Sequence, residues 1–139
     1  MNGDIAVIDI LRNDATAGAL VGGTGVNNAR VFPAELPQGE TYPAYVVDLY
    51  DTEPFDTKTG VSAVDHDLVK VFCYADTVHQ AVALQDAARG ALDGAAGTYN
   101  GKVVDYIRYL KNDGYNTPET NRRIYVREMD FMVRIRTGL

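Results

Sequence analysis

The sequence predicts an α+β domain in which a mainly antiparallel four-stranded sheet, made of two hairpins, carries its helices on one face. Two pairs of segments rich in β-branched and aromatic residues are each separated by a polar stretch, and two other segments show apolar residues at helical spacing. In the last segment, the apolar residues Met129, Phe131, Val133 and Ile135 alternate with a mostly charged set. One face of the sheet is therefore expected to be buried, and the other to meet water or a neighbouring subunit.

The first part of the chain predicts one helix and one short strand. Ile5, Ile8 and Leu11 recur three residues apart, which predicts an amphipathic helix from Asp4 to about Asn13. The glycine-rich stretch that follows, residues 15–28, is expected to be a loop with one helical turn. Residues 30–32 are expected to form a brief strand before a proline-rich connecting arm.

The middle of the chain predicts the first hairpin and the second helix. Residues 44–51 and 61–75 are the two strands, and the polar residues 52–60 form a long exposed loop. The helix covers residues 78–92, because its apolar residues recur at helical spacing. Asp76 or Thr77 can cap this helix with Gln80 in the capping-box position, and Gly94 supplies a stop.

The end of the chain predicts the second hairpin. Residues 102–110 and 123–136 are the strands, and a turn-rich loop of residues 111–121 contains Asp113-Gly114 and Pro118. Both predicted loops, 52–60 and 111–121, are long for hairpin connections and are expected to be mobile in an isolated subunit.

Composition excludes several classes of function. A chain of 139 residues fits one domain, residues 1–139, and 13 Lys and Arg against 19 Asp and Glu give a net charge of −6. That sign disfavours stable binding to nucleic acid. Cys73 is the only cysteine, so an intramolecular disulfide and a multi-cysteine zinc site are excluded. No apolar segment approaches the roughly 20 residues of a membrane-spanning helix, and no signal peptide is visible, so we expect no membrane partner and cytoplasmic synthesis.

Two motifs invite a ligand-binding interpretation. Residues 22–25 read Gly-Gly-Thr-Gly, but the Lys-Ser/Thr ending of a phosphate loop is missing, so an ordinary loop is favoured. Asp65 and Asp67 share one face of a strand, with His66 on the other, and the two carboxylates could hold a hard cation. A solvated strand face on the uncovered side of the sheet is favoured over that metal site.

The sequence contains few candidate catalytic residues. His66 and His79 are the only histidines and Ser62 the only serine, and the sequence places no nucleophile beside a base. Cys73 lies in an apolar strand, where a thiol is expected to be buried and unreactive. We therefore expect no enzyme activity, no cofactor and no metal.

Charge is distributed unevenly along the chain. Arginines gather near the carboxyl terminus, while the remainder of the chain is acidic. Surfaces of opposite sign suit head-to-tail association of copies, in which one patch meets its complement on the next subunit. The charge distribution alone supports the alternative equally well, namely that these residues form an evenly solvated strand of mixed charge.

An ordered series of short motifs runs through most of the chain, from Ile5 to Arg136. After the first helix come Arg-Val-Phe-Pro at residues 30–33, Leu-Pro-Gln-Gly at 36–39 and Tyr-Pro-Ala-Tyr-Val-Val at 42–47. Ala-Asp-Thr at 75–77, Ala-Leu-Asp-Gly at 91–94 and a closing Tyr-Val-Arg-Glu-Met-Asp-Phe at 125–131 follow in order. Taken together, the series resembles the small tail-completion, or tail-terminator, proteins of long-tailed bacteriophages and prophages.

The resemblance implies an α+β virion subunit, assembled in the host cytoplasm, that forms a hexameric ring on the head-proximal end of the tail tube. Such a ring stops tube polymerisation and offers a joining surface to the head-completion or connector protein. The family has no catalytic residues to carry over. An acidic lumen would let DNA pass without binding it.

The residues expected to serve these contacts fall into two groups. Contacts with a neighbouring subunit or the tail tube are expected from the two predicted loops and the carboxyl-terminal arginines: Phe55, Lys58, Tyr115, Arg122, Arg123, Arg127, Arg134 and Arg136. The channel is expected to be lined or bordered by acidic residues near the first hairpin: Asp48, Asp51, Asp65 and Asp67.

Two other functions stay open at this point. One is a different phage neck protein, such as a head-completion or connector subunit, which differs in its binding partner. The other, from a different class, is a small metal-dependent hydrolase that uses Asp65 and Asp67.

Overall fold

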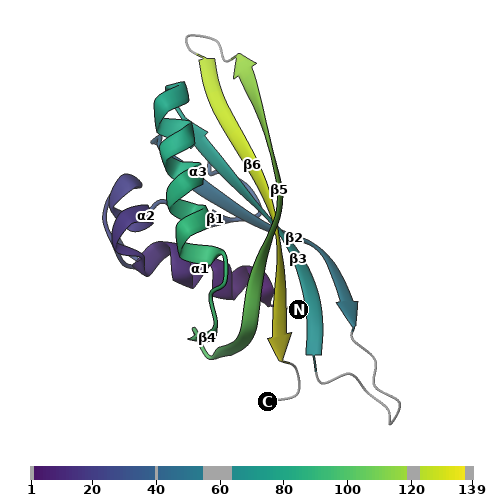
Figure 1. The fold of residues 1–139 in the computed structure, drawn as a ribbon. Helices are drawn as coiled ribbons and strands as arrows, with labels where there is room; N and C mark the ends of the chain where they lie inside the picture. The colour runs from purple at the N-terminus through teal and green to yellow at the C-terminus, as the bar shows by residue number, and fades with distance from the viewer. Residues whose placement is uncertain (1, 40, 55–63, 119–122, 137–139) are drawn as a thin grey trace.

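The structure, a computed structural model, describes residues 2–39, 41–54, 64–118 and 123–136. It has two layers, a twisted sheet and a group of three helices that all lie on one side of it (Figure 1). The helices are α1 (Gly3–Asn13), α2 (Ala15–Leu20) and α3 (Val78–Leu92). The prediction of an α+β fold with helices on one face of the sheet is confirmed.

The sheet has six strands rather than the predicted four, in the order β1-β2-β3-β6-β5-β4. Their bounds are β1 (Val31–Pro33), β2 (Ala44–Pro54), β3 (Val64–Ala75), β4 (Gly97–Tyr99), β5 (Lys102–Pro118) and β6 (Arg123–Arg136). Four of the neighbouring pairs are antiparallel, and β1 pairs with β2 in parallel. The two hairpins form the centre of the sheet, and the three-residue strands β1 and β4 flank it.

The predicted loops are shorter than expected, because the strands continue into them. Residues 52–54 pair with β3, and residues 111–118 pair with β6. The Asp113-Gly114 turn prediction is therefore wrong, since both residues lie within β5 opposite Glu128 and Arg127. The remainder of each predicted loop lies outside the described residues.

The hydrophobic core lies between the helices and the sheet. Every second residue of β3 from Val69 to Ala75 is fully buried, and so are Met129, Phe131 and Val133 on β6. Leu84 and Leu92 of α3 and Leu11 of α1 meet them from the helix side. The alternation read from the last strand is thus confirmed in its buried half.

Local signals explain both ends of α3 and the start of α2. Thr77 caps α3 by accepting a hydrogen bond of 3.1 Å from the Gln80 backbone, and the Gln80 side chain accepts one from the Asp76 backbone. Gly94 follows the helix with a φ of 82°, a conformation that costs glycine little. Asp14 separates α1 from α2 and caps α2 by accepting from the backbones of Thr16 and Ala17.

Strand β3 supplies the cap that α1 lacks locally. Asn2 precedes the helix but makes no side-chain capping hydrogen bond. Instead, the Gly3 backbone donates to the Asp67 carboxylate, 2.7 Å away, and Asp67 is fully buried. A carboxylate at a helix amino terminus is favoured by the partial positive charge there. This contact ties the first turn of α1 to the centre of the sheet.

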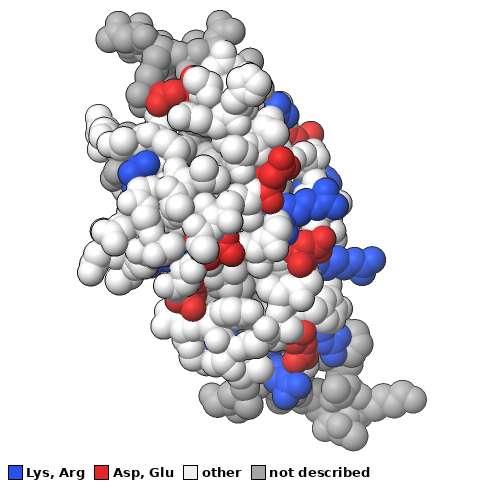
Figure 2. All heavy atoms as spheres, turned by 60° about the vertical axis from the view of Figure 1, so that its left-hand side comes forward, with Lys and Arg blue, Asp and Glu red and all other residues white. Residues whose placement is uncertain are grey.

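The helix side of the molecule carries few charges. Figure 2 brings this side forward and shows mostly uncharged surface, with charged side chains most frequent along the right-hand margin of the view and only a few scattered over the rest. Large apolar residues that are 37–68% exposed occur on α2, α3 and the loop after α2: Leu20, Val26, Val78 and Val82. Within the described residues, no helix has the length and apolar content needed to cross a lipid bilayer.

Candidate interaction surface

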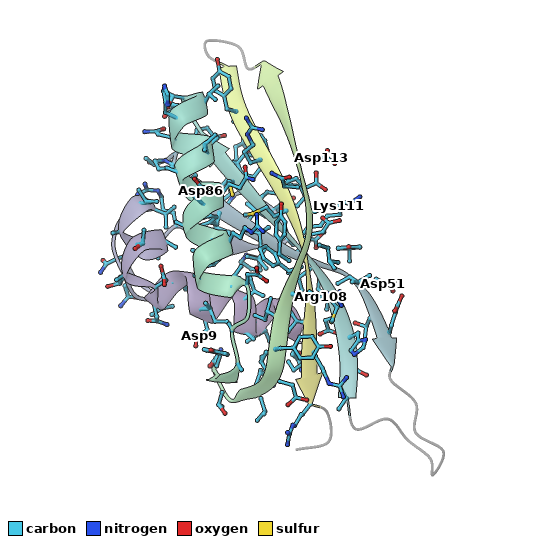
Figure 3. All side chains as sticks on the ribbon, in the orientation of Figure 1. Asp9, Asp51, Asp86, Arg108, Lys111 and Asp113 are labelled. Carbon is cyan, nitrogen blue, oxygen red and sulfur yellow. The ribbon has the colours of Figure 1, made fainter. Side chains whose placement is uncertain are left out.

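The face of the sheet opposite the helices is its open face. Residues directly opposite each other on antiparallel strands point to the same side of a sheet, so the register assigns every residue to a face. Leu68, Lys70 and Phe72 lie on the open face, because the intervening residues of β3 belong to the core. Figure 3 shows Asp51, Lys111 and Asp113 projecting on this side, and Asp9 and Asp86 on the helix side.

A cluster of charged groups occupies the middle of the open face. Lys70 contacts Glu128 at 2.5 Å and Asp130 at 3.4 Å. Asp130 is 95% buried by its neighbours, which also include the Tyr50 hydroxyl at 3.5 Å. The hydrogen bond to Glu128, opposed by desolvation, raises the pKa of Lys70 and keeps it charged. This cluster pairs cations and carboxylates of the same subunit.

A second charged cluster lies closer to the carboxyl end of β6. Asp105 accepts hydrogen bonds from Arg136 Nε at 2.9 Å and from Arg134 Nε at 3.3 Å. Arg134 Nη1 also lies 3.3 Å from His66 Nε2, and its guanidinium lies 5.9 Å from the centre of the Tyr106 ring. Both arginines therefore have a partner within the subunit.

Replacing Asp105 with asparagine is expected to lower the urea midpoint of unfolding at neutral pH. The hydrogen bond from Arg136 holds the pKa of Asp105 below its ordinary value of 3.8. A carboxyl group with a lowered pKa stabilises the folded chain above its ordinary pKa, and this contribution is lost as the pH falls through the lowered value. The difference between the wild-type and variant midpoints should therefore begin to shrink below about pH 4 and disappear below the lowered pKa. Asp86→Asn, on an exposed position of α3, is the control; a midpoint difference for Asp105→Asn that is constant from neutral to acid pH would contradict the assignment.

Charges at the two margins of the open face lack such partners. Asp48, Asp51 and Glu53 lie on β2, and Arg108 lies on β5, and none of the four forms an ion pair among the described residues. Lys111, whose side chain is 68% exposed, reaches Asp130 only at 3.9 Å. The β2 margin is therefore acidic, and the β5 margin is basic at Arg108 and Lys111.

The bulge at Tyr50 places both aspartates of β2 on the open face. Asp48 pairs with Lys70 and Asp51 with Leu68, so the register shifts by one residue between Leu49 and Asp51. Without this bulge, two residues three positions apart would point to opposite faces. A matching shift between Tyr109 and Lys111 on β5 places both Arg108 and Lys111 on the open face.

The predicted acidic group is divided by the structure. Asp48 and Asp51 lie on the open face, whereas Asp65 and Asp67 lie on the face that carries the helices. The expectation that the latter two sit on the uncovered side is wrong, because Asp67 is fully buried against Gly3 at the start of α1. A role of Asp48, Asp51 and Asp65 at a channel stays a prediction.

The predicted basic group is also dispersed. Arg134 and Arg136 lie at one end of β6 and bind Asp105, whereas Arg127 lies at the other end, with its side chain over Gly114. The backbones of Tyr115 and Arg123 belong to β5 and β6, but their side chains are not among those described. Phe55, Lys58 and Arg122 lie outside the described residues. A contact role for these residues stays a prediction.

The candidate ligand motifs have structural roles. In the glycine-rich loop, the Gly23 backbone donates to Gly18 and the Gly25 backbone to Arg12, so these N–H groups point into the chain. Cys73 is fully buried, and desolvation raises its thiol pKa, as expected for an unreactive cysteine. Among the described residues, no three His, Cys, Asp or Glu side chains gather as a metal site would require.

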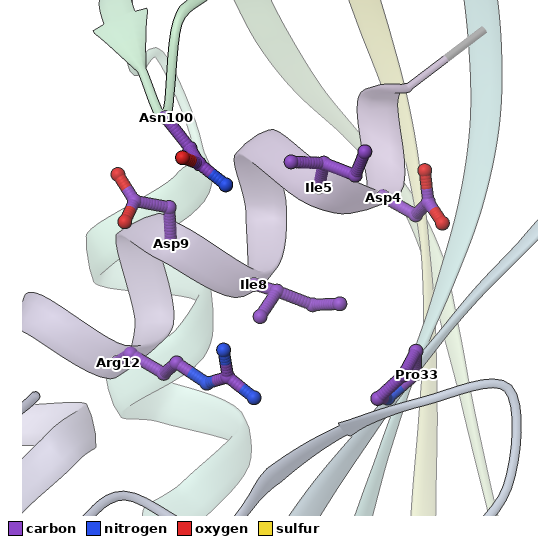
Figure 4. A pocket seen from close by; sticks show the side chains of 7 residues that line it. All are labelled: Asp4, Ile5, Ile8, Asp9, Arg12, Pro33 and Asn100. Carbon is purple, nitrogen blue, oxygen red and sulfur yellow. The ribbon is translucent and has the colours of Figure 1, made fainter. Parts of the chain in front are cut away.

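A pocket of about 250 Å³ lies beside α1, between this helix and the ends of β1 and the β4–β5 turn (Figure 4). It is lined by Asp4, Ile5, Ile8, Asp9, Arg12, Pro33 and Asn100. Arg12 Nη2 donates to the Val31 carbonyl at 2.9 Å and so ties α1 to β1. The lining combines two carboxylates, one guanidinium, one amide and three apolar side chains, and it contains no serine, cysteine or histidine.

Sequence reasoning missed Arg108 and Lys111 as candidate contact residues. Both belong to a segment with mixed composition, in which the predicted strand was expected to end at Leu110. They are identified by the register of β5 against β6, which places both side chains on the open face and is known only from the tertiary structure.

Comparisons with known proteins agree with this picture of a structural subunit. A chain in the solved structure described as the virion of a native gene transfer agent (GTA) particle is 26% identical to this one, with a TM-score of 0.65. The match covers 96% of this chain and 94% of that chain. No protein with a curated description matches. The family described as tail completion protein gp17 matches residues 5–136, nearly the whole chain, and the protein belongs to that family.

Proposed function

We propose that this protein forms a ring at the head-proximal end of a phage tail tube, stops the polymerisation of the tube and provides the surface to which the head joins. The observation that carries the proposal is the family match over residues 5–136, which makes the chain a structural tail protein located in the virion tail or neck. The virion chain with the same fold supports it, because the likeness extends over nearly the full length of both chains.

The form of the subunit suits such a role. The helices cover one face of the sheet and leave the other uncovered, and the two hairpins extend in opposite directions beyond the helices (Figure 1). A subunit between a tube and a head must bind two different partners at its two ends, the tail-tube protein and a head-completion or connector protein. Opposed hairpins offer one surface for each. The subunit acts by binding alone and not as an enzyme.

Deleting the coding sequence from the phage or prophage that carries it tests the proposal. Without a terminating ring, tubes are expected to grow beyond their normal length, and heads are expected to lack tails. Electron microscopy measures the tube lengths, and expression of the protein in trans should restore them. If the tubes keep their normal length but stay unattached to heads, the protein is a head-joining neck component instead.

A channel through such a ring must let DNA pass. The net charge of −6 is consistent with a lumen that repels phosphate, and Asp48, Asp51 and Asp65 remain candidates for its border. A basic lumen would attract the phosphate groups and hold the DNA in the channel, whereas an acidic lumen repels them.

A further inference from the structure

We infer that copies of this chain associate through the two margins of the open face, with the acidic β2 margin of one copy against the basic β5 margin of the next. The β2 margin consists of Asp48, Asp51 and Glu53, and the β5 margin consists of Arg108 and Lys111. This inference rests on the proposed function, because it names the surfaces by which the ring is built.

The first argument is that the margin charges have weak ion pairs or none within the subunit, since even Lys111 reaches Asp130 only at 3.9 Å. The inner charges of the open face, such as Lys70, Asp130 and Asp105, all have partners of opposite sign in the same chain. Asp51 and Arg108 are exposed and have none among the described residues. In the rows of paired residues that contain Asp48 and Asp51, the remaining charges are negative on the β2 margin and positive on the β5 margin, so they attract each other only between copies. Asp113 is also exposed on the open face of β5, but its row runs through Glu128 and Phe72 to the apolar Val46 of β2.

The second argument is that the acidic and basic margin residues lie at matching positions along their strands. Asp48 pairs with Lys70, Lys70 with Asp130 and Asp130 with Lys111, so Asp48 and Lys111 stand in one row across the sheet. In the same way, Asp51 stands in one row with Leu68, Met132 and Arg108. A neighbour placed beside the subunit at the same height therefore brings Asp48 to Lys111 and Asp51 to Arg108.

The third argument is that all four side chains point to the same side. They lie on the open face, and a head-to-tail neighbour presents its open face in the same direction. Three antiparallel steps separate β2 from β5, so β5 of the neighbour would run antiparallel to β2, as the strands within the sheet do. Repetition of such a heterologous contact closes into a ring when the rotation between copies allows it.

The backbone at the β5 margin indicates that the contact uses side chains. The Gly94 backbone donates to the Ile107 carbonyl at 2.8 Å, and the Tyr109 backbone donates to Asp93 at 3.1 Å. These bonds occupy the outward groups of β5 beside Arg108 and prevent continuation of the sheet there. Long side chains at the margin, such as those of Arg108 and Lys111, can still reach the carboxylates of a neighbour.

Charges at sheet edges also protect proteins from aggregation, and that role makes a different prediction. Edge charges protect against aggregation when the edges of two copies carry charges of the same sign and therefore repel each other. Here the two margins carry charges of opposite sign in the same rows of the sheet, so association between copies is favoured. The distinction is open to measurement, because protection predicts that removing the charges increases association.

The experiment measures association of the purified full chain by native mass spectrometry and sedimentation at low and high salt. Asp51→Arg and Arg108→Asp each place like charges opposite each other and are expected to weaken association at least about tenfold. Asp86→Arg makes the same change on the helix side and should leave association unaltered. Wild-type association should also weaken with salt, because the margin charges are exposed.

The double variant Asp51→Arg/Arg108→Asp exchanges the two charges and is expected to restore association to within about threefold of wild type. An equimolar mixture of the two single variants should also associate, because each carries the sign that the other needs. Circular dichroism shows that each variant folds. A variant that does not fold is replaced by its neutral form, Asp51→Asn or Arg108→Gln, which should weaken association to a smaller degree.

The failure of this inference differs from the failure of the proposed function. If the wild-type chain associates and all single variants associate equally well, or if association strengthens when the charges are removed, the margins are not the contact. In that case the ring is built through other surfaces, and the proposed role in stopping the tube is unaffected. If the wild-type chain stays monomeric at all salt and protein concentrations, the inference is overturned, whereas the proposed function is overturned only by normal tube lengths in the deletion mutant.

Discussion

Replacing Phe131 with alanine is expected to lower the free energy of unfolding by about 3–5 kcal/mol, the typical loss for a buried phenylalanine. Phe131 lies on β6, which pairs with β3 on one side and β5 on the other, and its side chain is fully buried. Its ring meets that of Tyr109 edge to face, with the centroids 5.7 Å apart. The substitution leaves a cavity at the point where the two hairpins and the helices meet.

Urea unfolding followed by circular dichroism measures this effect. Leu110→Ala is the control, because Leu110 stands at the bulge of β5 and is 45% exposed. Its replacement should cost less than about 1 kcal/mol, since much of the side chain is already in water. If Phe131→Ala does not fold, Phe131→Leu should fold with a smaller loss. Equal losses for Phe131→Ala and Leu110→Ala would show that the core does not lie between the helices and the sheet.

Replacing Asp67 with alanine is expected to lower the free energy of unfolding by about 2 kcal/mol, the scale of a hydrogen bond to a charged group. Asp67 is the cap of α1, and its carboxylate accepts from the Gly3 backbone while interacting favourably with the helix dipole. Asp51→Ala, on the exposed margin of β2, is the control and should have little effect on unfolding of the monomer. An unchanged midpoint for Asp67→Ala would show that the contact does not stabilise the helix.

The same contact predicts that two glycine-to-alanine substitutions have opposite signs. A Cβ at Gly3 would lie 2.8 Å from Asp67 Cβ and Oδ2, too close for either group to stay in place, so Gly3→Ala should destabilise the fold. Gly90 lies in α3 with nothing within 4 Å of an added Cβ. Gly90→Ala should therefore stabilise the fold by about 0.5–1 kcal/mol, the difference in helix propensity. If both substitutions stabilise, helix propensity outweighs the contact with Asp67.

Local signals in the sequence predict the two longer helices well. The limits of α3 follow from Thr77, Gln80 and Gly94, whose capping roles depend on residues within one helical turn. The α1 prediction of residues 4–13 differs from Gly3–Asn13 by one residue. Its amino-terminal cap could not be predicted, because Asp67 is 64 residues away in sequence.

Local signals predict the strands less well. Residues such as Asp113 and Gly114 favour turns, but pairing with β6 holds them in an extended strand. The short strand β4 was missed because three residues show no periodicity, and its pairing with β5 depends on the turn that joins them. Strand ends in this protein are decided by the length of the partner strand.

The sequence by itself determined the α+β class, the helices α1 and α3, the core face of β6 and the resemblance to tail-completion proteins, because each depends on residues close together or on their order. Only the tertiary structure decided that Asp67 is buried at a helix end, and that Asp51 and Arg108 share a row and a face. Those relations depend on strand register and on two bulges. A shift of one residue reverses the face of every side chain beyond it, and no local pattern in the sequence specifies where that shift occurs.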